Sequence, residues 1–213
     1  MQLIGMLDSP YVRRVAISLQ LLDLCFEHRS ISVFSTFAQF QKINPVVKAP
    51  SLVCDDGEVL MDSGLILEYA EALAAPGRSL MPAAIAERQH ALQVVGLALA
   101  ACEKSVQIVY EHKVRPAEKL HAPWIERVSG QLFAAYDGLE LALARRKLDT
   151  GSTIDQAALS SAVAWRFTQE MLPEIIPANN YPHLQALSAW AEALPEFIAA
   201  PYGDSTYPAK KST

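Results

Sequence analysis

A serine followed directly by a proline stands near the start of the chain, at Ser9 and Pro10. Proline suits the first position of a helix because its missing N–H is one that the helix does not use. Ser9 is therefore expected to cap a helix. A helix N-terminus attracts anions, so a ligand thiolate near Ser9 would gain from the partial positive charge and from a hydroxyl donor. The plain alternative is a cap with no further role.

Lys48, Ala49 and Pro50 form a second candidate site at the expected start of a strand. Proline heading a strand inside a domain can mark a cis peptide bond, which exposes neighbouring backbone groups. Ala49 would then pair its N–H and C=O with an extended peptide ligand, and Lys48 would meet a terminal carboxylate. The alternative is a tight turn with a solvated lysine.

Asp62 and Ser63 precede Gly64 at the start of a third expected helix. Helix N–H groups and the Ser63 hydroxyl suit an α-carboxylate, and the Asp62 carboxylate suits an ammonium group, so the pair can bind an amino-acid head group. Asp and Ser are also ordinary helix caps.

The elements that position these residues follow from the spacing of apolar side chains. Four short apolar runs predict strands, and three stretches with helical spacing predict helices, giving the order βαβαββα. The strands are expected at 2–6, 25–31, 51–54 and 58–61, and the helices at 10–22, 36–43 and 63–75. In such a fold the starts of the first helix, the third strand and the third helix can lie along one sheet edge. They would line one groove for a short peptide carrying a thiol.

The second half of the chain is expected to be helical. Ala, Leu, Glu and Gln dominate it, and prolines and a glycine separate apolar stripes at 83–116, 122–146, 153–170 and 182–193. The predicted domains are 1–75 and 83–200, joined by a linker at 76–82 and followed by a tail at 201–213.

Composition narrows the function classes. The chain has 213 residues, is 51% hydrophobic and carries a formal charge of -5, which favours neither nucleic acid nor an anionic membrane as a partner. No basic leader or uninterrupted apolar span of membrane length is evident, so a cytoplasmic location is expected. Cys25, Cys54 and Cys102 are interpreted as buried small hydrophobes, and the histidines lack zinc spacing, so no metal is expected.

Taken together, the motifs resemble those of the glutathione transferase family, in its bacterial, serine-type form. The resemblance covers the N-terminal half and lies in Ser9–Val15 (SPYVRRV), Asn44–Pro45 with Lys48–Val53 (KAPSLV), and Asp62–Tyr69 (DSGLILEY). It implies a thioredoxin-like α/β domain followed by an all-α domain. A looser match at Ser152–Asp155 resembles the family's helix-capping box.

The resemblance also implies roles for single residues. Ser9 matches the serine that activates the glutathione thiol, and Lys48 the residue near the glycyl carboxylate. Ala49 matches the residue that pairs with the cysteinyl backbone, Pro50 the cis-proline, and Asp62 with Ser63 the γ-glutamyl clamp. Glutathione is then the co-substrate, a homodimer is expected, and no metal is required.

The expected reaction is attack of the glutathione thiolate on a small apolar electrophile, with Ser9 lowering the thiol pKa by donating a hydrogen bond. Candidate residues around the electrophile are Tyr11, Tyr110, Arg115 and Trp165. For Tyr110, Arg115 and Trp165 the alternative is a purely structural role, such as packing in the core. A disulfide reductase is a poorer match, because that chemistry needs a cysteine where Ser9 stands. A non-catalytic interaction or carrier protein, like the stringent-starvation relatives of this family, is the remaining alternative.

Overall fold

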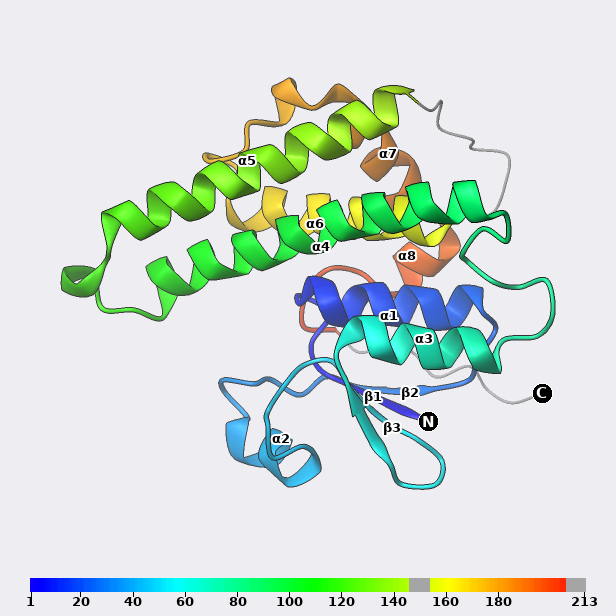
Figure 1. Cartoon of the computed structure of the whole chain (residues 1–213). Helices are drawn as coiled ribbons and strands as arrows, with labels where there is room; N and C mark the ends of the chain where they lie inside the picture. The colour runs from blue at the N-terminus through cyan, green and yellow to red at the C-terminus, as the bar shows by residue number, and fades with distance from the viewer. Residues whose placement is uncertain (146–153, 206–213) are drawn as a thin grey trace. The chain divides into compact units, whose positions relative to one another are not determined.

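The computed structural model describes residues 1–145 and 154–205, which divide into two compact units (Figure 1). Unit 1 comprises Met1–Leu80 with the chain from Ala193 on, and unit 2 comprises Met81–Glu192. The predicted βαβαββα order of the N-terminal part and the helical nature of the part that follows are both confirmed.

Unit 1 contains a four-stranded mixed sheet in the order β2-β1-β3-β4. β1 (Gln2–Ile4) pairs parallel with β2 (Glu27–Arg29) and antiparallel with β3 (Ser51–Val53), which pairs antiparallel with β4 (Val59–Met61). Leu3 stands opposite both His28 and Leu52, so the register places buried side chains side by side at the centre. The Asp55-Asp56-Gly57 turn closes the β3–β4 hairpin, with Gly57 at φ +92°.

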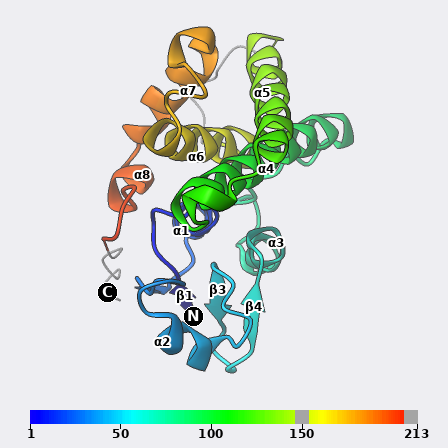
Figure 2. The same cartoon turned by 90° about the vertical axis from the view of Figure 1, so that its left-hand side faces the viewer.

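Helices cover both faces of this sheet. α1 (Pro10–Leu21) and α3 (Ser63–Leu73) pack together on one face, and α2 (Phe37–Ile43) lies on the other (Figure 2). Beneath α2 the sheet contributes to a core cluster of Ile4, Ile31 and Phe40. α2 ends where predicted, because Asn44 precedes Pro45 and adopts extended backbone angles.

The end of the described chain differs from the expected domain boundary. Residues 193–200 were assigned to the helical domain, whereas they group with unit 1 through α8 (Pro195–Ala199), which packs on α1. Arg13, 1% exposed, donates from Nε to the Ala200 carbonyl at 2.8 Å, and its guanidinium lies 5.4 Å from the Phe197 ring centroid. A buried guanidinium needs such acceptors, which fixes this segment to α1.

Unit 2 contains four longer helices. α4 (Ile85–Lys113) packs against α5 (Ala122–Arg145) and α6 (Gln156–Met171), and α7 (Pro182–Glu192) packs against α5 and α6. Single 3₁₀ turns, η1 (Ala117–Lys119) and η2 (Ala178–Asn180), precede α5 and α7. Among the described helices, α4 has the length and apolar composition of a membrane span, a property that core helices of soluble proteins share.

α6 begins at its own cap. The Asp155 side chain accepts the Ala158 N–H at 2.8 Å, so Asp155 is the N-cap and the helix starts at Gln156. The expected capping box started at Ser152, which, like Thr153, lies outside the described residues. Asp155 does take part in capping this helix, but it is the N-cap itself and not a residue of the first turn.

Candidate functional site

Ser9 caps α1 as predicted. Its backbone is extended, Pro10 follows as the first helical residue, and Ser9 Oγ accepts the Val12 N–H at 3.5 Å. Because the hydroxyl accepts this bond, its own proton stays available for donation to an anion. The first turn of α1 has no acidic residue, so the positive end of the helix is not neutralised from within.

Gly5 brings three segments into close approach at the end of β1. Its φ is +136°, and a Cβ added there would lie 2.6 Å from Val12 Cγ2 and 3.2 Å from Ala49 Cβ. Only glycine fits this position. The His28 ring nitrogen Nε2 lies 2.7 Å from the Gly5 carbonyl oxygen, and burial lowers the pKa of His28. Neither residue was singled out from the sequence, because both roles depend on tertiary contacts.

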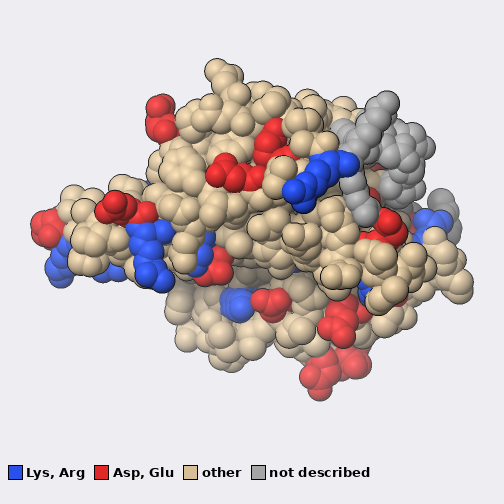
Figure 3. Space-filling model, turned by 45° about the horizontal axis from the view of Figure 1, so that its top comes forward, with Lys and Arg blue, Asp and Glu red and all other residues tan. Residues whose placement is uncertain are grey.

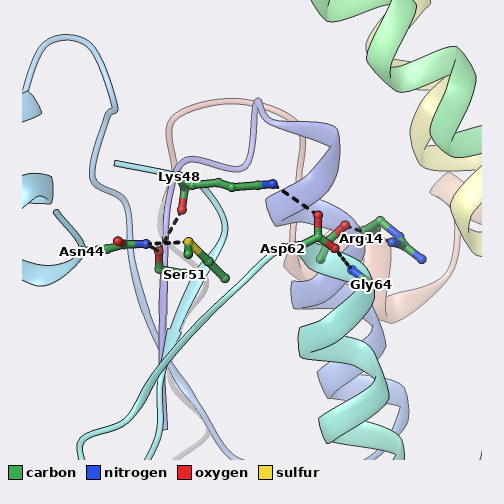
Figure 4. Close-up of polar contacts among 8 residues, drawn as sticks. Arg14, Asn44, Lys48, Ser51, Asp62 and Gly64 are labelled. Carbon is green, nitrogen blue, oxygen red and sulfur yellow. Dashed lines mark hydrogen bonds and ion pairs between the residues drawn. The ribbon is translucent and has the colours of Figure 1, made fainter. Parts of the chain in front are cut away.

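The segment before Pro50 is held by two hydrogen bonds (Figure 4). Asn44 Nδ2 donates to Ser51 Oγ at 2.8 Å, and Ser51 Oγ donates to the Lys48 carbonyl oxygen at 2.8 Å. Asn44 is 5% exposed, and the Ala49–Pro50 peptide bond is cis. Asn44 and Ser51 thus set the backbone of the segment that contains Lys48 and Ala49.

Lys48 and Asp62 face each other. Lys48 Nζ lies 3.4 Å from Asp62 Oδ2, with about half of each side chain exposed, and Asp62 Oδ1 accepts the Gly64 N–H at 2.9 Å (Figure 4). Partial burial alone would raise the pKa of Asp62, but the Gly64 N–H and Lys48 lower it overall. The two residues were expected at opposite ends of a ligand, so the ion pair must open for both to bind. An exposed pair opens at little cost.

Ser63 lies deeper than Asp62. It is 4% exposed, and its Oγ accepts a hydrogen bond from Arg14 Nη1 at 3.0 Å. Arg14 comes from α1 and is 3% exposed (Figure 4). The sequence motif contained Arg14, but no role was assigned to it. The signal in the sequence was the pair Arg13–Arg14 among the apolar residues at the start of α1.

These contacts bring the three predicted loop ends together within unit 1. Gly5 joins the first turn of α1 to Ala49, Lys48 joins the start of β3 to Asp62, and Arg14 joins α1 to Ser63. The starts of α1, β3 and α3 therefore share one edge of the sheet, and the candidate side chains gather there.

Asp8 is a charged neighbour of Ser9 that the sequence analysis missed. Burial raises the pKa of Asp8, the nearby Asp204 raises it further, and hydrogen bonding from the Ser9 N–H partly offsets the rise. An ionised Asp8 opposes a thiolate near Ser9, because like charges repel across a short distance.

Of the four candidate residues around the electrophile, Trp165 takes the structural role that was its alternative. It is 3% exposed, and its ring centroid lies 5.4 Å from that of Tyr136 and 5.7 Å from that of Tyr181, in the core of unit 2. Tyr110 is 44% exposed on α4. Arg115 pairs with Glu111 through two bonds of 2.6 and 2.9 Å.

Tyr11 lies in the first turn of α1, two residues from Ser9, and is partly buried. It belongs to unit 1, whereas Tyr110 and Arg115 belong to unit 2. A lining role for these three residues stays a prediction.

The three cysteines differ in exposure. Cys54 and Cys102 are buried as expected, whereas Cys25 is exposed, in the loop before β2. Within residues 1–145 and 154–205, no three His, Cys, Asp or Glu side chains gather as metal ligands do. Basic and acidic side chains are interspersed over the face drawn in Figure 3, in keeping with 18 basic and 23 acidic residues.

The chain is similar in sequence to known proteins. Residues 3–78 match the family profile described as "Glutathione S-transferase, N-terminal domain". The uncharacterized GST-like protein YibF of Escherichia coli (strain K12) is 28% identical over 165 residues, covering 77% of this chain and 80% of YibF.

Solved structures show the same fold. A glutathione transferase family member from Pseudomonas fluorescens Pf-5, with bound glutathione, is 29% identical with a TM-score of 0.80, covering 93% of this chain and 97% of that one. A glutathione S-transferase from Methylobacterium radiotolerans JCM 2831, in complex with glutathione sulfonate, has a TM-score of 0.85 at 23% identity, covering 100% of this chain and 96% of that one. The chain has the glutathione transferase fold, and its N-terminal part matches that family's N-terminal profile.

Proposed function

We propose that this protein is a glutathione transferase that joins the glutathione thiolate to a small apolar electrophile. The observation that carries the proposal is the gathering of the starts of α1, β3 and α3 at one sheet edge, with Ser9, Ala49 and Ser63 among them. Relatives of the same fold bind glutathione, and the N-terminal part of this chain matches their family profile.

Ser9 is proposed to activate the thiol without forming a covalent bond. Its hydroxyl accepts a hydrogen bond from the Val12 N–H and donates one to the thiolate, which also lies at the positive end of α1. Both effects favour the charged form and lower the thiol pKa. The thiolate then attacks an electrophilic carbon that the protein holds in place.

The remaining site residues are proposed to bind the peptide. The Ala49 backbone pairs with the cysteinyl residue beside Pro50, and Lys48 binds the glycyl carboxylate. Asp62 binds the γ-glutamyl ammonium group, and Ser63 the α-carboxylate. Lys48 and Asp62 exchange their mutual ion pair for these ligand contacts.

Replacing the hydroxyl tests the enzymatic role. Ser9→Ala is expected to keep glutathione affinity and to lower kcat about 10- to 100-fold, because the lost bond is strongest to the thiolate. The measurements are glutathione binding by calorimetry and conjugation of a chromogenic aryl halide. Asp155→Ala, which also removes a helix cap, is the control for a loss of stability alone. Equal rates for Ser9→Ala and the parent would remove Ser9 from the mechanism.

A binding protein without turnover is the second candidate. Asp8 in its ionised form favours it, since a negative charge next to Ser9 opposes thiolate formation, although burial raises the pKa of Asp8 and so weakens this effect. Immobilised glutathione separates the possibilities: retention with conjugation supports the transferase, retention without conjugation supports a carrier, and failure to bind supports an interaction module.

The proposal also includes the assembly and location of the protein. We propose that it forms a homodimer and acts in the cytoplasm.

A further inference from the structure

Arg14 is buried between α1 and α3, beneath the start of the third helix. It is 3% exposed, and its Nη1 donates to Ser63 Oγ at 3.0 Å. Burying a guanidinium away from water costs free energy unless the group forms hydrogen bonds or an ion pair. One partner here is the hydroxyl of Ser63, the first residue of α3, which the proposed function uses for ligand binding.

The chemistry of the guanidinium fixes the role of the Ser63 hydroxyl. Arginine has only donors, so Ser63 Oγ must accept this bond, and its own hydrogen points to another group. A hydroxyl oriented in this way is a donor for a carboxylate and a poor partner for an ammonium group. Asp62, one residue earlier, offers the opposite property.

Arg14 also supplies charge that the start of α3 lacks. Asp62 Oδ1 already accepts the Gly64 N–H at 2.9 Å, and Asp62 adds a negative charge there. A carboxylate bound beside Asp62 needs a compensating cation, and the proposed function uses Lys48 at the other end of the ligand, for the glycyl carboxylate. The guanidinium behind Ser63 meets this need at short range.

We propose that Arg14 is a positioning residue that orients the Ser63 hydroxyl as a donor and supplies the positive charge for the α-carboxylate of a γ-glutamyl group. The inference rests on the proposed function, because it assumes a γ-glutamyl peptide at this site. Arg13, its neighbour, is equally buried but faces the Ala200 carbonyl and the Phe197 ring instead.

The test compares two ligands, glutathione and 4-aminobutanoyl-cysteinylglycine, which lacks only the α-carboxylate. Calorimetry gives the ratio of the two Kd values for each protein. The parent is expected to prefer glutathione, and Arg14→Gln to lose about tenfold or more of that preference, because a charge-assisted contact is removed. Arg13→Gln, the matched control, should keep the parent's ratio.

A second comparison, between single and double variants at Arg14 and Ser63, shows whether Arg14 acts through the Ser63 hydroxyl or only through the stability of the fold. If Arg14 acts through this hydroxyl, Arg14→Gln should reduce the preference much less in a Ser63→Ala background than in the parent. If circular dichroism shows that Arg14→Gln does not fold, Arg14→Lys replaces it. Lysine has one ammonium group on a shorter side chain, so this variant is expected to lose the preference for glutathione severalfold.

The outcomes distinguish this inference from the proposed function. A parent that does not bind glutathione contradicts the function itself. A parent that binds glutathione no better than the analogue, or variants at Arg14 that keep the parent's ratio, would overturn the role of Arg14 while leaving glutathione binding intact.

Discussion

His28 shows how one buried side chain can make the stability of the fold depend on pH. Burial lowers its pKa below the ordinary 6.5, so the folded protein holds a neutral ring against the Gly5 carbonyl. The unfolded chain takes up a proton at higher pH than the folded chain does. The stability that the neutral His28 ring contributes is therefore fully present above about pH 6.5, and it is lost as the pH falls from there through the lower pKa of the folded state.

His28→Gln is expected to remove this pH dependence, because an amide can still donate to the Gly5 carbonyl but does not titrate. Urea unfolding at pH 7.5 and pH 5.5 measures it. The parent should lose more stability than His28→Gln over this interval, whereas His121→Gln, a change at an exposed histidine, should behave as the parent does. A variant at His28 with the parent's full pH dependence would assign the effect to other groups.

Single residues also show where sequence reasoning reaches its limit. Ser9, Lys48 and Asp62 were found because cap residues and a proline at a strand start leave local signals. Arg14 and Gly5 were missed, since their importance lies in contacts with segments distant along the chain. For Trp165 the sequence leaves a pocket and the core both open, because an aromatic residue on a helix gives no sign of which it faces, and the structure places it in the core.

At the scale of elements, the spacing of apolar residues predicts every longer described helix and all four described strands. The predicted ranges differ from the observed ones by a few residues at their ends, and most are longer, because periodicity no longer constrains the boundary there. α8 and the two 3₁₀ turns are too short to give a periodic signal. α8 is stabilised by its packing on α1, which sequence spacing does not report.

The start of α6 carries a prediction that belongs to this scale. Asp155 satisfies the Ala158 N–H, so Asp155→Ala should lower the free energy of unfolding by about 1 kcal/mol. Asp155→Asn keeps an acceptor oxygen and should lose much less. Chemical denaturation followed by circular dichroism measures both. Equal losses for the two variants would show that charge near the helix end, not the hydrogen bond, matters there.

At the scale of the whole molecule, an apolar stripe on unit 1 has consequences for assembly. Its side chains come from β4 and one side of α3, are between 36% and 61% exposed, and comprise Val59, Met61, Leu65, Tyr69 and Leu73. Leu65, Tyr69 and Leu73 are spaced four residues apart, so they line one face of the helix. Soluble proteins rarely leave such a contiguous face in water, and a second copy of the chain is the partner expected for it.

Sedimentation of the purified protein is therefore expected to give the mass of a dimer. Leu65→Glu should shift the equilibrium toward the monomer, because a carboxylate is desolvated wherever the stripe is covered. Ile198→Glu is the matched control, since Ile198 is 64% exposed on α8, outside the stripe, and Leu65 is 61% exposed. If both variants sediment as the parent does, the stripe is not the dimer interface. If only Ile198→Glu dissociates, the interface lies near α8, and a surface next to Arg13 and the C-terminal segment takes its place.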